Sequence, residues 1–261
     1  MGVSKPLKYM GGKTGLAATI SELMLWDRPI YVEPFFGSGG FFFQKPPHKI
    51  EVVNDKSSEL VRFYRVMREQ PKELKELLLA TPIAKDEWRA CQELHNCSDL
   101  EFARRYFVSM NQSRIPGGSK NSWSNPVDIE RVVISDQFYS RAVSLPSFSA
   151  RLQNVVIENR CALKLIEKFN YPNTIIYCDP PYLGCTQYNE TFDEEEHWRF
   201  LELCNSSSAS ILISAFRNEL YDELLSHWWR IDVPYPNSLG IGNKRVVESF
   251  YMNYEVQGRL W

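Results

Sequence analysis

The stretch Pro29-Ile-Tyr-Val-Glu-Pro-Phe-Phe-Gly-Ser-Gly-Gly40 decides the fold expected for this chain of 261 residues. A short apolar run leads into a glycine-rich turn, and the apolar run Phe41–Phe43 follows. This order is typical of the first strand, turn and helix of a nucleotide-binding α/β half. Gly37, Gly39 and Gly40 let the backbone approach a ligand closely, and the helix start behind them can face an anionic group. We therefore expect an α/β domain with a ligand site at this turn.

A second apolar run, Val52-Val53-Asn54-Asp55, ends in an acid. Nucleotide-binding folds commonly place the residue that holds the ribose hydroxyls after the second strand, so Asp55 is predicted to bind a ribose. The alternative is a capping role for the helix that begins near Ser57. The two roles are compatible.

The run Ile175-Ile-Tyr-Cys-Asp-Pro-Pro-Tyr182 carries the chemistry. An amine on an aromatic ring is a poor nucleophile because its lone pair is delocalised into the ring. The Asp179 carboxylate can accept one N–H of such an amine, and the Pro180 carbonyl, whose direction Pro181 restricts, can accept the other. Tyr182 offers a ring on which an extruded base can stack. We predict that this motif activates the exocyclic amine of adenine; the alternative is a plain strand followed by a Pro-Pro turn.

Phe216 follows the apolar run Ile211–Ser214. Its ring is predicted to form an opposing wall for the base, with a position in the hydrophobic core as the alternative. At the N-terminus, Leu7–Lys13 supplies an aromatic ring, a glycine pair and a cation. We expect Lys13 to pair with the carboxylate of a ligand and Tyr9 to lie near a cationic or adenine group, unless the segment is a disordered arm.

The order of these motifs resembles the D12 class of DNA adenine-N6 methyltransferases, the Dam-like family, over nearly the whole chain. The resemblance extends to the acidic loop and helix at 54–64, to Ile213-Ser214 ahead of Leu220-Tyr221, and to Lys244-Arg245 ahead of Glu248-Ser249-Phe250. It implies S-adenosylmethionine as cofactor. It also implies cofactor contacts from Tyr9, Lys13, Asp55 and Asp179, in a pocket shaped by Glu33, Phe35, Gly37 and Gly39.

Two positions depart from the family pattern. Tyr9 stands where the family usually has Trp, which keeps an aromatic face. Cys161 stands near the position where the family often has an acid that reads the adenine ring of the cofactor. Cys161 is kept as a cofactor-binding position, with backbone carbonyls or Asn159 as the alternative acceptors for that ring; one lost hydrogen bond of this kind costs roughly 1 kcal/mol.

Methyl transfer from a sulfonium requires neither a metal nor a covalent nucleophile, and the sequence predicts neither. The six cysteines contain no C-x-x-C pair and the four histidines are scattered, so no zinc site or disulfide frame is indicated. Cys178 precedes Asp179 within the strand and is predicted to be structural.

The composition, with 44% hydrophobic and 13% aromatic residues, agrees with a soluble intracellular enzyme that has one α/β core and an inserted or appended subdomain. No run approaches the roughly 20 apolar residues of a membrane span, and Lys5 and Lys8 precede no apolar signal-peptide region. A cytoplasmic location is therefore expected.

The net charge of −2 is not the basic balance expected of a DNA-binding protein, so a local patch is needed. The segment 101–151 contains seven Lys and Arg residues and four acidic residues, a surplus of three positive charges. Within it, Asn111–Ser124 is rich in turn formers and hydrogen-bonding side chains. We predict that this loop contacts double-stranded DNA, the alternative being an ordinary solvated loop. The predicted DNA-binding residues are Arg114, Lys120, Asn121, Trp123, Lys244 and Arg245.

The predicted organisation is a discontinuous catalytic domain, 1–80 and 155–261, interrupted by a target-recognition insert at 81–154. The catalytic domain is expected to be a Rossmann-like α/β methyltransferase fold. The insert is expected to be mostly helical, with helices at 86–88 and 101–110 and a loop or hairpin at 111–126. Later strands are predicted at 155–157, 174–178, 210–214, 229–233 and 248–254. A monomer or weak dimer is expected.

The sequence thus predicts transfer of a methyl group from S-adenosylmethionine to adenine N6 in duplex DNA, by base flipping and direct displacement. Other methyltransferase substrates stay open, namely RNA adenine and protein glutamine, because a planar amide poses the same problem. A catalytically inactive DNA-binding module and a nicotinamide-dependent oxidoreductase are less favoured. Phe42 stands where the dinucleotide fingerprint needs its third glycine, and the acid, proline and tyrosine of the motif at 179–182 are intact.

Overall fold

The computed structural model describes residues 3–9, 11–114, 123, 133–184, 192–236 and 245–256. Contacts divide the chain into two compact units. The helical unit comprises Met1–Ala18, Gly37–Pro46 and Ser57–Ile157, and the sheet unit comprises Thr19–Phe36, Pro47–Lys56 and Glu158–Trp261. The domain boundaries predicted from the sequence, at 80 and 155, stay a prediction.

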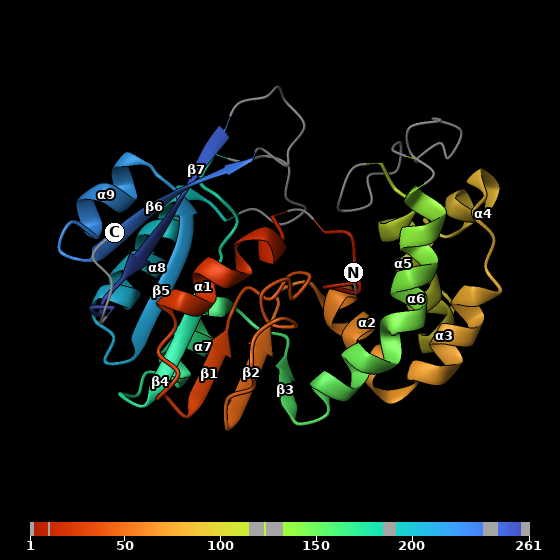
Figure 1. Cartoon of the computed structure of the whole chain (residues 1–261), viewed down its shortest axis with the longest axis horizontal. Coiled ribbons are helices and arrows are strands. Elements are labelled where there is room, and N and C mark those ends of the chain that lie inside the picture. Colours follow the sequence, from red (N-terminus) through yellow and green to blue (C-terminus); the bar gives the residue numbers. More distant parts are fainter. Residues whose placement is uncertain are drawn as a thin grey trace. The chain divides into compact units, whose positions relative to one another are not determined.

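A seven-stranded sheet runs in the order β3-β2-β1-β4-β5-β7-β6 (Figure 1). β1 pairs in parallel with β2 and β4, and β4 pairs in parallel with β5, whereas β7 is antiparallel to β5 and β6. Chain order therefore runs outward from β1 in one direction and from β4 in the other. Open α/β sheets bind ligands at such a switch point, outside the carboxyl ends of the strands. The strands are Ile30–Glu33 (β1), Ile50–Asn54 (β2), Val155–Glu158 (β3), Thr174–Cys178 (β4), Ser210–Phe216 (β5), Trp229–Pro236 (β6) and Arg245–Met252 (β7).

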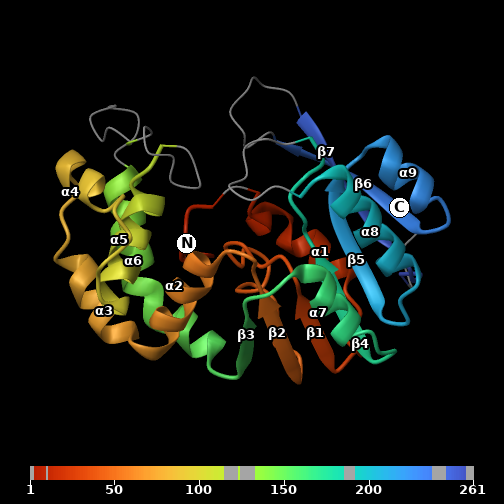
Figure 2. The same cartoon turned by 180° about the vertical axis from the view of Figure 1, so that it is seen from behind.

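The parallel strands of the sheet unit are continuous apolar runs in the sequence because both faces of the sheet are covered. All five residues of β4 are buried, as expected for a strand covered on both faces. Residues of α7 (Ala162–Lys168), α8 (Glu194–Asn205) and α9 (Glu219–Leu224) share one core cluster with the sheet, and α1 (Ala17–Leu23) covers the other face (Figures 1 and 2). Cys178 is fully buried in this cluster, so its predicted structural position is confirmed.

The helical unit is built around an aromatic core. Ser57 caps α2 by accepting from the Leu60 N–H, and Ser98 caps α5 by accepting from the Glu101 N–H. The buried faces of α2 and α5 meet through Phe63, whose ring lies 5.7 Å from that of Tyr106. Helices predicted at 86–88 and 101–110 are confirmed. The unit contains α2 (Ser58–Glu69), α3 (Pro71–Leu79), α4 (Lys85–Ala90), α5 (Asp99–Asn111) and α6 (Val133–Leu152), after a 3-10 turn at Lys13–Leu16.

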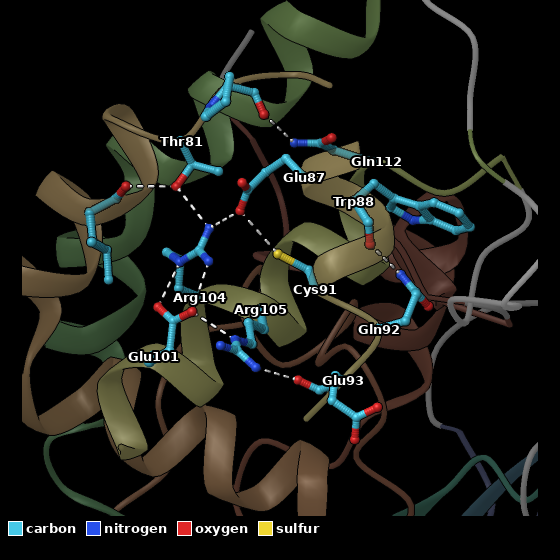
Figure 3. Close-up of polar contacts among 12 residues, drawn as sticks. Thr81, Glu87, Trp88, Cys91, Gln92, Glu93, Glu101, Arg104, Arg105 and Gln112 are labelled. Atoms are coloured by element: carbon cyan, nitrogen blue, oxygen red, sulfur yellow. Dashed lines mark hydrogen bonds and ion pairs between the residues drawn. The ribbon is translucent and has the colours of Figure 1, made fainter. Parts of the chain in front are cut away.

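An ion-pair network in the helical unit engages two of the arginines counted from the sequence (Figure 3). Arg104 donates to both Glu101 oxygens at 2.8 Å and also pairs with Glu87. Arg105 donates to Glu101 at 2.7 Å. The hydrogen bond from Arg104 lowers the pKa of Glu101 to about 2, so this carboxylate stays charged. Arg151 lies 4.0 Å from the ring centroid of Phe42. These three arginines are engaged within the protein, and Glu87, which lies outside the segment 101–151, offsets one charge of the surplus counted there.

Two kinds of feature are absent from the described ranges. No helix there combines the length and apolar character of a bilayer crossing. Nor do three or more His, Cys, Asp or Glu side chains within these ranges gather in an arrangement that suits a metal ion.

Candidate active site

Three acids lie at the carboxyl ends of three neighbouring parallel strands. Glu33 is the last residue of β1, Asp55 follows β2, and Asp179 follows β4. Because β1 lies between β2 and β4 in register, the three strand ends share one edge of the sheet. The topology therefore brings together acids that are far apart in the sequence, at the position where α/β folds bind ligands.

Asp179 is held by a buried hydroxyl. The Ser214 Oγ on β5 donates to Asp179 Oδ1 at 3.2 Å and lies 3.1 Å from the Tyr177 hydroxyl. Burial, and next the charge of Asp179, raise the pKa of Tyr177 well above its usual value, so this phenol stays protonated. It can therefore donate to Ser214 while Ser214 donates to Asp179. This chain of hydroxyls orients one oxygen of the carboxylate.

Tyr182 is less open than the sequence predicts. Its hydroxyl donates to both Glu248 oxygens, at 2.8 and 3.1 Å, and only 7% of the residue is exposed. Its ring centroid lies 4.1 Å from that of Phe216. A base between two rings needs about 7 Å, twice the usual contact distance. In this conformation the two rings contact each other directly, so no base fits between them; an opposing wall from Phe216 requires the rings to separate and stays a prediction.

Glu33 is buried at the end of β1, and Phe35 follows in a partly buried position. The Tyr31 hydroxyl donates to Glu33 Oε2 at 2.6 Å, and Glu33 is 3% exposed. Phe35 makes edge contacts with Phe192 and Phe200, with ring centroids 5.6 and 5.8 Å apart. Phe35 thus joins the wall of the core, while Glu33 places a carboxylate at the strand end.

Hydrogen bonds tie the loop after β3 to the loop after β2. Asn159 Nδ2 donates to the carbonyls of Asp55 and Lys56 at 2.8 and 3.1 Å. Asn54 Nδ2 donates to the Arg160 carbonyl at 3.1 Å. Cys161 follows as the N-cap residue of α7 and is exposed. Cys161 is therefore near the β2 end, and Asn159 uses its amide N–H groups to hold the Asp55 loop.

The remaining predicted cofactor residues belong to the helical unit. Gly37 and Gly39 have φ of +50° and +63°, a region that favours glycine. A Cβ at Gly37 would lie 3.5 Å from the Tyr9 ring, and Tyr64 donates to the Gly37 carbonyl at 3.0 Å. Lys13 is 6% exposed and donates to the Gly11 carbonyl at 3.2 Å. The N-terminal segment and the glycine turn therefore pack together.

Only part of the predicted DNA surface lies within the described residues. Arg114 is exposed, and its carbonyl accepts from Lys8 Nζ at 2.9 Å. Trp123 is half-buried and forms an isolated antiparallel bridge with Ser113, which agrees with the predicted hairpin. Arg245 begins β7. Lys120, Asn121 and Lys244 lie outside the described residues.

Glu248, which accepts from the Tyr182 hydroxyl, and the buried His197 were not singled out in the sequence as site residues. His197 is fully buried, and its Nδ1 lies 2.9 Å from the Tyr221 hydroxyl. The sequence does indicate that His197 is buried, because its spacing from Phe200, Leu201 and Cys204 is that of one buried helix face. Asp193 and Glu196 also form a capping box, which fixes the start of α8.

The buried imidazole of His197 should make stability depend on pH. Burial lowers its pKa from 6.5 to about 4. Between pH 6.5 and 4 the unfolded chain binds a proton at His197, whereas the folded protein does not. The contribution of neutral His197 to the free energy of unfolding is therefore complete above pH 6.5 and is lost as the pH falls towards 4. The free energy of unfolding should therefore fall between pH 7 and 4 by about 3 kcal/mol more in the wild type than in His197→Gln. Urea titrations at both pH values test this, and equal losses would contradict it.

Comparison with known proteins identifies the family. The family model of the D12 class N6 adenine-specific DNA methyltransferase matches residues 9–109 and 135–235. The chain is 26% identical over 249 residues to the type II methyltransferase M1.LlaDCHI of Lactococcus lactis subsp. cremoris, covering 83% of this chain and 82% of the relative. Among solved structures, protein LPL1258 of Legionella pneumophila has 13% identity and a TM-score of 0.32, covering 96% of this chain and 85% of that one. The chain belongs to the D12 class of N6 adenine-specific DNA methyltransferases.

Proposed function

We propose that this adenine-specific DNA methyltransferase takes its methyl group from S-adenosylmethionine and delivers it to N6 of an adenine flipped out of duplex DNA. One observation carries the proposal. Asp179 follows the buried strand β4 at the switch point of the sheet, oriented by Ser214, at the same edge as Glu33 and Asp55.

The residues present fit the cofactor. Carboxylates at the ends of β1 and β2 suit the hydroxyls of a ribose, and the acidic edge suits a positively charged sulfur. In the helical unit, Thr14 Oγ1 and Ser38 Oγ are buried without a hydrogen-bond partner among the described residues. Such groups are rarely left unsatisfied unless a ligand or water takes them.

We propose the following roles for the cofactor-binding residues. Asp55 would hold the ribose, Lys13 the carboxylate tail, and Asn159 or Cys161 the adenine edge. Burial first, and then the charges of Arg141 and Lys13, lower the pKa of Lys5 to about 8, so these three cations lie close enough to interact, and such a group suits an anionic tail. When bound, the cofactor supplies an activated methyl group.

The four residues of the motif would prepare the amine. Asp179 accepts one N–H and the Pro180 carbonyl the other, which turns the nitrogen lone pair out of the ring plane. Tyr182 supports the base on the face that Phe216 does not cover, or after the two rings separate. Once the new N–C bond has formed, the Asp179 carboxylate can take the proton that the nitrogen must release.

Residues of the helical unit are proposed to contact the DNA target, with the exposed Arg114 and the half-buried Trp123 as the described candidates. The relative from Lactococcus is named a type II methyltransferase, and we propose that this chain likewise acts in a restriction-modification system. A cytoplasmic location and a monomer or weak dimer stay part of the proposal.

The test is incubation with S-adenosylmethionine carrying an isotope-labelled methyl group and duplex DNA, followed by digestion to nucleosides and mass spectrometry. Label in N6-methyldeoxyadenosine is expected. RNA of the same sequence and a glutamine-containing protein serve as parallel substrates. Label confined to RNA, protein or methylcytosine would overturn the proposal.

Gly37→Ala should weaken cofactor binding. The change forces a side chain into φ +50° and adds a Cβ 3.5 Å from the Tyr9 ring, at the turn where the backbone is proposed to approach the ligand. Gly184→Ala is the matched control, since φ there is +76° and nothing lies within 4 Å of the added Cβ. Both variants should lose about 1 kcal/mol of stability. Calorimetric titration should show weaker binding of S-adenosylmethionine only for Gly37→Ala, and equal affinities would contradict the assignment.

A further inference from the structure

Hydrogen bonds join the N-terminal segment to the end of α5, more than a hundred residues further along the chain. The Lys8 N–H donates to Asn111 Oδ1 at 3.0 Å, and Asn111 Nδ2 donates to the Pro6 carbonyl at 3.4 Å. The Lys8 ammonium donates to the carbonyls of Ser113 and Arg114, at 2.7 and 2.9 Å. Lys8 therefore holds both the last residue of α5 and the chain that leaves the helix.

The segment that carries Lys8 is itself fixed in the helical unit. Leu7 is fully buried, and the Tyr9 ring packs against the glycine turn at Gly37. Lys8 lies half-buried between these two neighbours. A cation is also favoured beyond the C-terminus of a helix, where the helix dipole is negative. The Lys8 ammonium can therefore hold the chain beyond α5 in a defined position.

Arg114 is the first exposed residue after α5. Residues 111–113 are buried, and the Ser113 hydroxyl accepts from Trp88 Nε1 at 3.0 Å. The Ser113 and Arg114 carbonyls belong to the two peptide groups that flank the Cα of Arg114, and both accept from the same ammonium. Because peptide groups are planar, fixing both of them fixes the two backbone dihedrals of Arg114. The direction in which the Arg114 side chain leaves the backbone thus depends on Lys8.

From this geometry we infer that Lys8 is a positioning residue that aims Arg114 at the DNA. The inference rests on the proposed role of Arg114 as a DNA contact, since an exposed arginine suits a backbone phosphate. Lys8 would act without touching the DNA itself. Its ammonium is bound to two carbonyls, and moving it to a phosphate would break both hydrogen bonds.

A double-mutant cycle on duplex DNA tests the inference, with Lys8→Met, Arg114→Ala and the double variant. Methionine keeps a flexible unbranched side chain but removes the ammonium. Lys8→Arg keeps a cation with several donors. Lys72→Met, at an exposed lysine on α3 of the same unit, is the matched control for loss of one positive charge. The measurements are the Kd for a duplex that the wild type methylates, at fixed salt, kcat with DNA saturating, calorimetric affinity for S-adenosylmethionine, and the unfolding temperature.

Lys8→Met should raise the Kd for the duplex about tenfold, the effect of losing about one charge-assisted hydrogen bond, and should leave kcat and cofactor affinity unchanged. Lys8→Arg should restore most of the affinity, and Lys72→Met should bind DNA like the wild type. Because Lys8 acts through Arg114, the double variant should bind DNA no more weakly than Arg114→Ala alone.

A rise in Kd in the double variant equal to the product of the two single effects would overturn the inference, since Lys8 would then contribute to binding independently of Arg114. Equal affinities of Lys8→Met and Lys72→Met, or wild-type affinity of Arg114→Ala, would also overturn it. If Lys8→Met does not fold, the neutral Lys8→Gln replaces it in the cycle under the same criteria. A wild type that methylates no DNA would instead refute the proposed function itself.

Discussion

Replacing Asp179 with alanine is expected to lower kcat on duplex DNA about a thousandfold, the range seen when one preorganised group that stabilises a transition state is removed. The carboxylate is the charged acceptor of the amine, and Ser214 holds one of its oxygens at 3.2 Å. Without it, the lone pair of the amine stays conjugated with the adenine ring. Rates are measured in single turnover with the cofactor saturating.

Measuring the affinity for S-adenosylmethionine distinguishes a loss of catalysis in Asp179→Ala from a loss of the cofactor pocket. Asp179→Ala is expected to raise the Kd for S-adenosylmethionine by less than about tenfold, since one charge among several is lost. Asp27→Ala is the matched control, because Asp27 is a 70% exposed acid in the same unit and pairs with Arg28. That control should keep wild-type kinetics. Full activity of Asp179→Ala with cofactor bound would refute the assigned chemistry.

Replacing Tyr182 with alanine should give the second largest loss, about a hundredfold in kcat/KM, because stacking on an aromatic side chain contributes about 1–3 kcal/mol per base. The ring is proposed to receive the flipped adenine on the face away from Phe216. Fluorescence of 2-aminopurine placed at the target position reports extrusion of the base, and its rise on binding should be smaller in this variant.

Tyr182→Phe distinguishes the ring from the hydroxyl. It keeps the stacking surface but removes the donor to Glu248, which is 3% exposed, so it should cost about 1–3 kcal/mol of stability. Its kcat/KM should stay close to that of the wild type. If alanine and phenylalanine reduced extrusion equally, the hydroxyl rather than the ring would be the important group.

Much of the fold could be predicted from the sequence because its elements are encoded locally. The strand predicted at 174–178 is observed with the same bounds, since a short apolar run flanked by turn formers has few alternatives. Helix α6 was not predicted as an element, and Pro146 inside it is a residue that locally disfavours helix. The glycine turn was also predicted correctly, because φ of +50° and +63° at 37 and 39 requires glycine.

Contacts between distant residues could not be predicted in the same way. The sequence indicated that Arg104 and Arg105 add to a positive surface, whereas Glu101 and Glu87 neutralise them. Which charges pair depends on how α4 and α5 pack, and no local pattern records that packing. The pairing of Tyr182 with Phe216 likewise follows from the positions of β4 and β5 in the sheet.

By itself the sequence determined the strand-and-turn elements, the family and the identity of the acids at the strand ends, because each depends on residues adjacent in the chain. Only the tertiary structure decided which buried groups orient those acids and the motif at 179–182. Ser214 reaches Asp179, Glu248 reaches Tyr182 and His197 reaches Tyr221 because strand order and helix packing bring together residues from separate segments. Side-chain hydrogen bonds act over about 3 Å, so their partners are fixed only once the chain has folded.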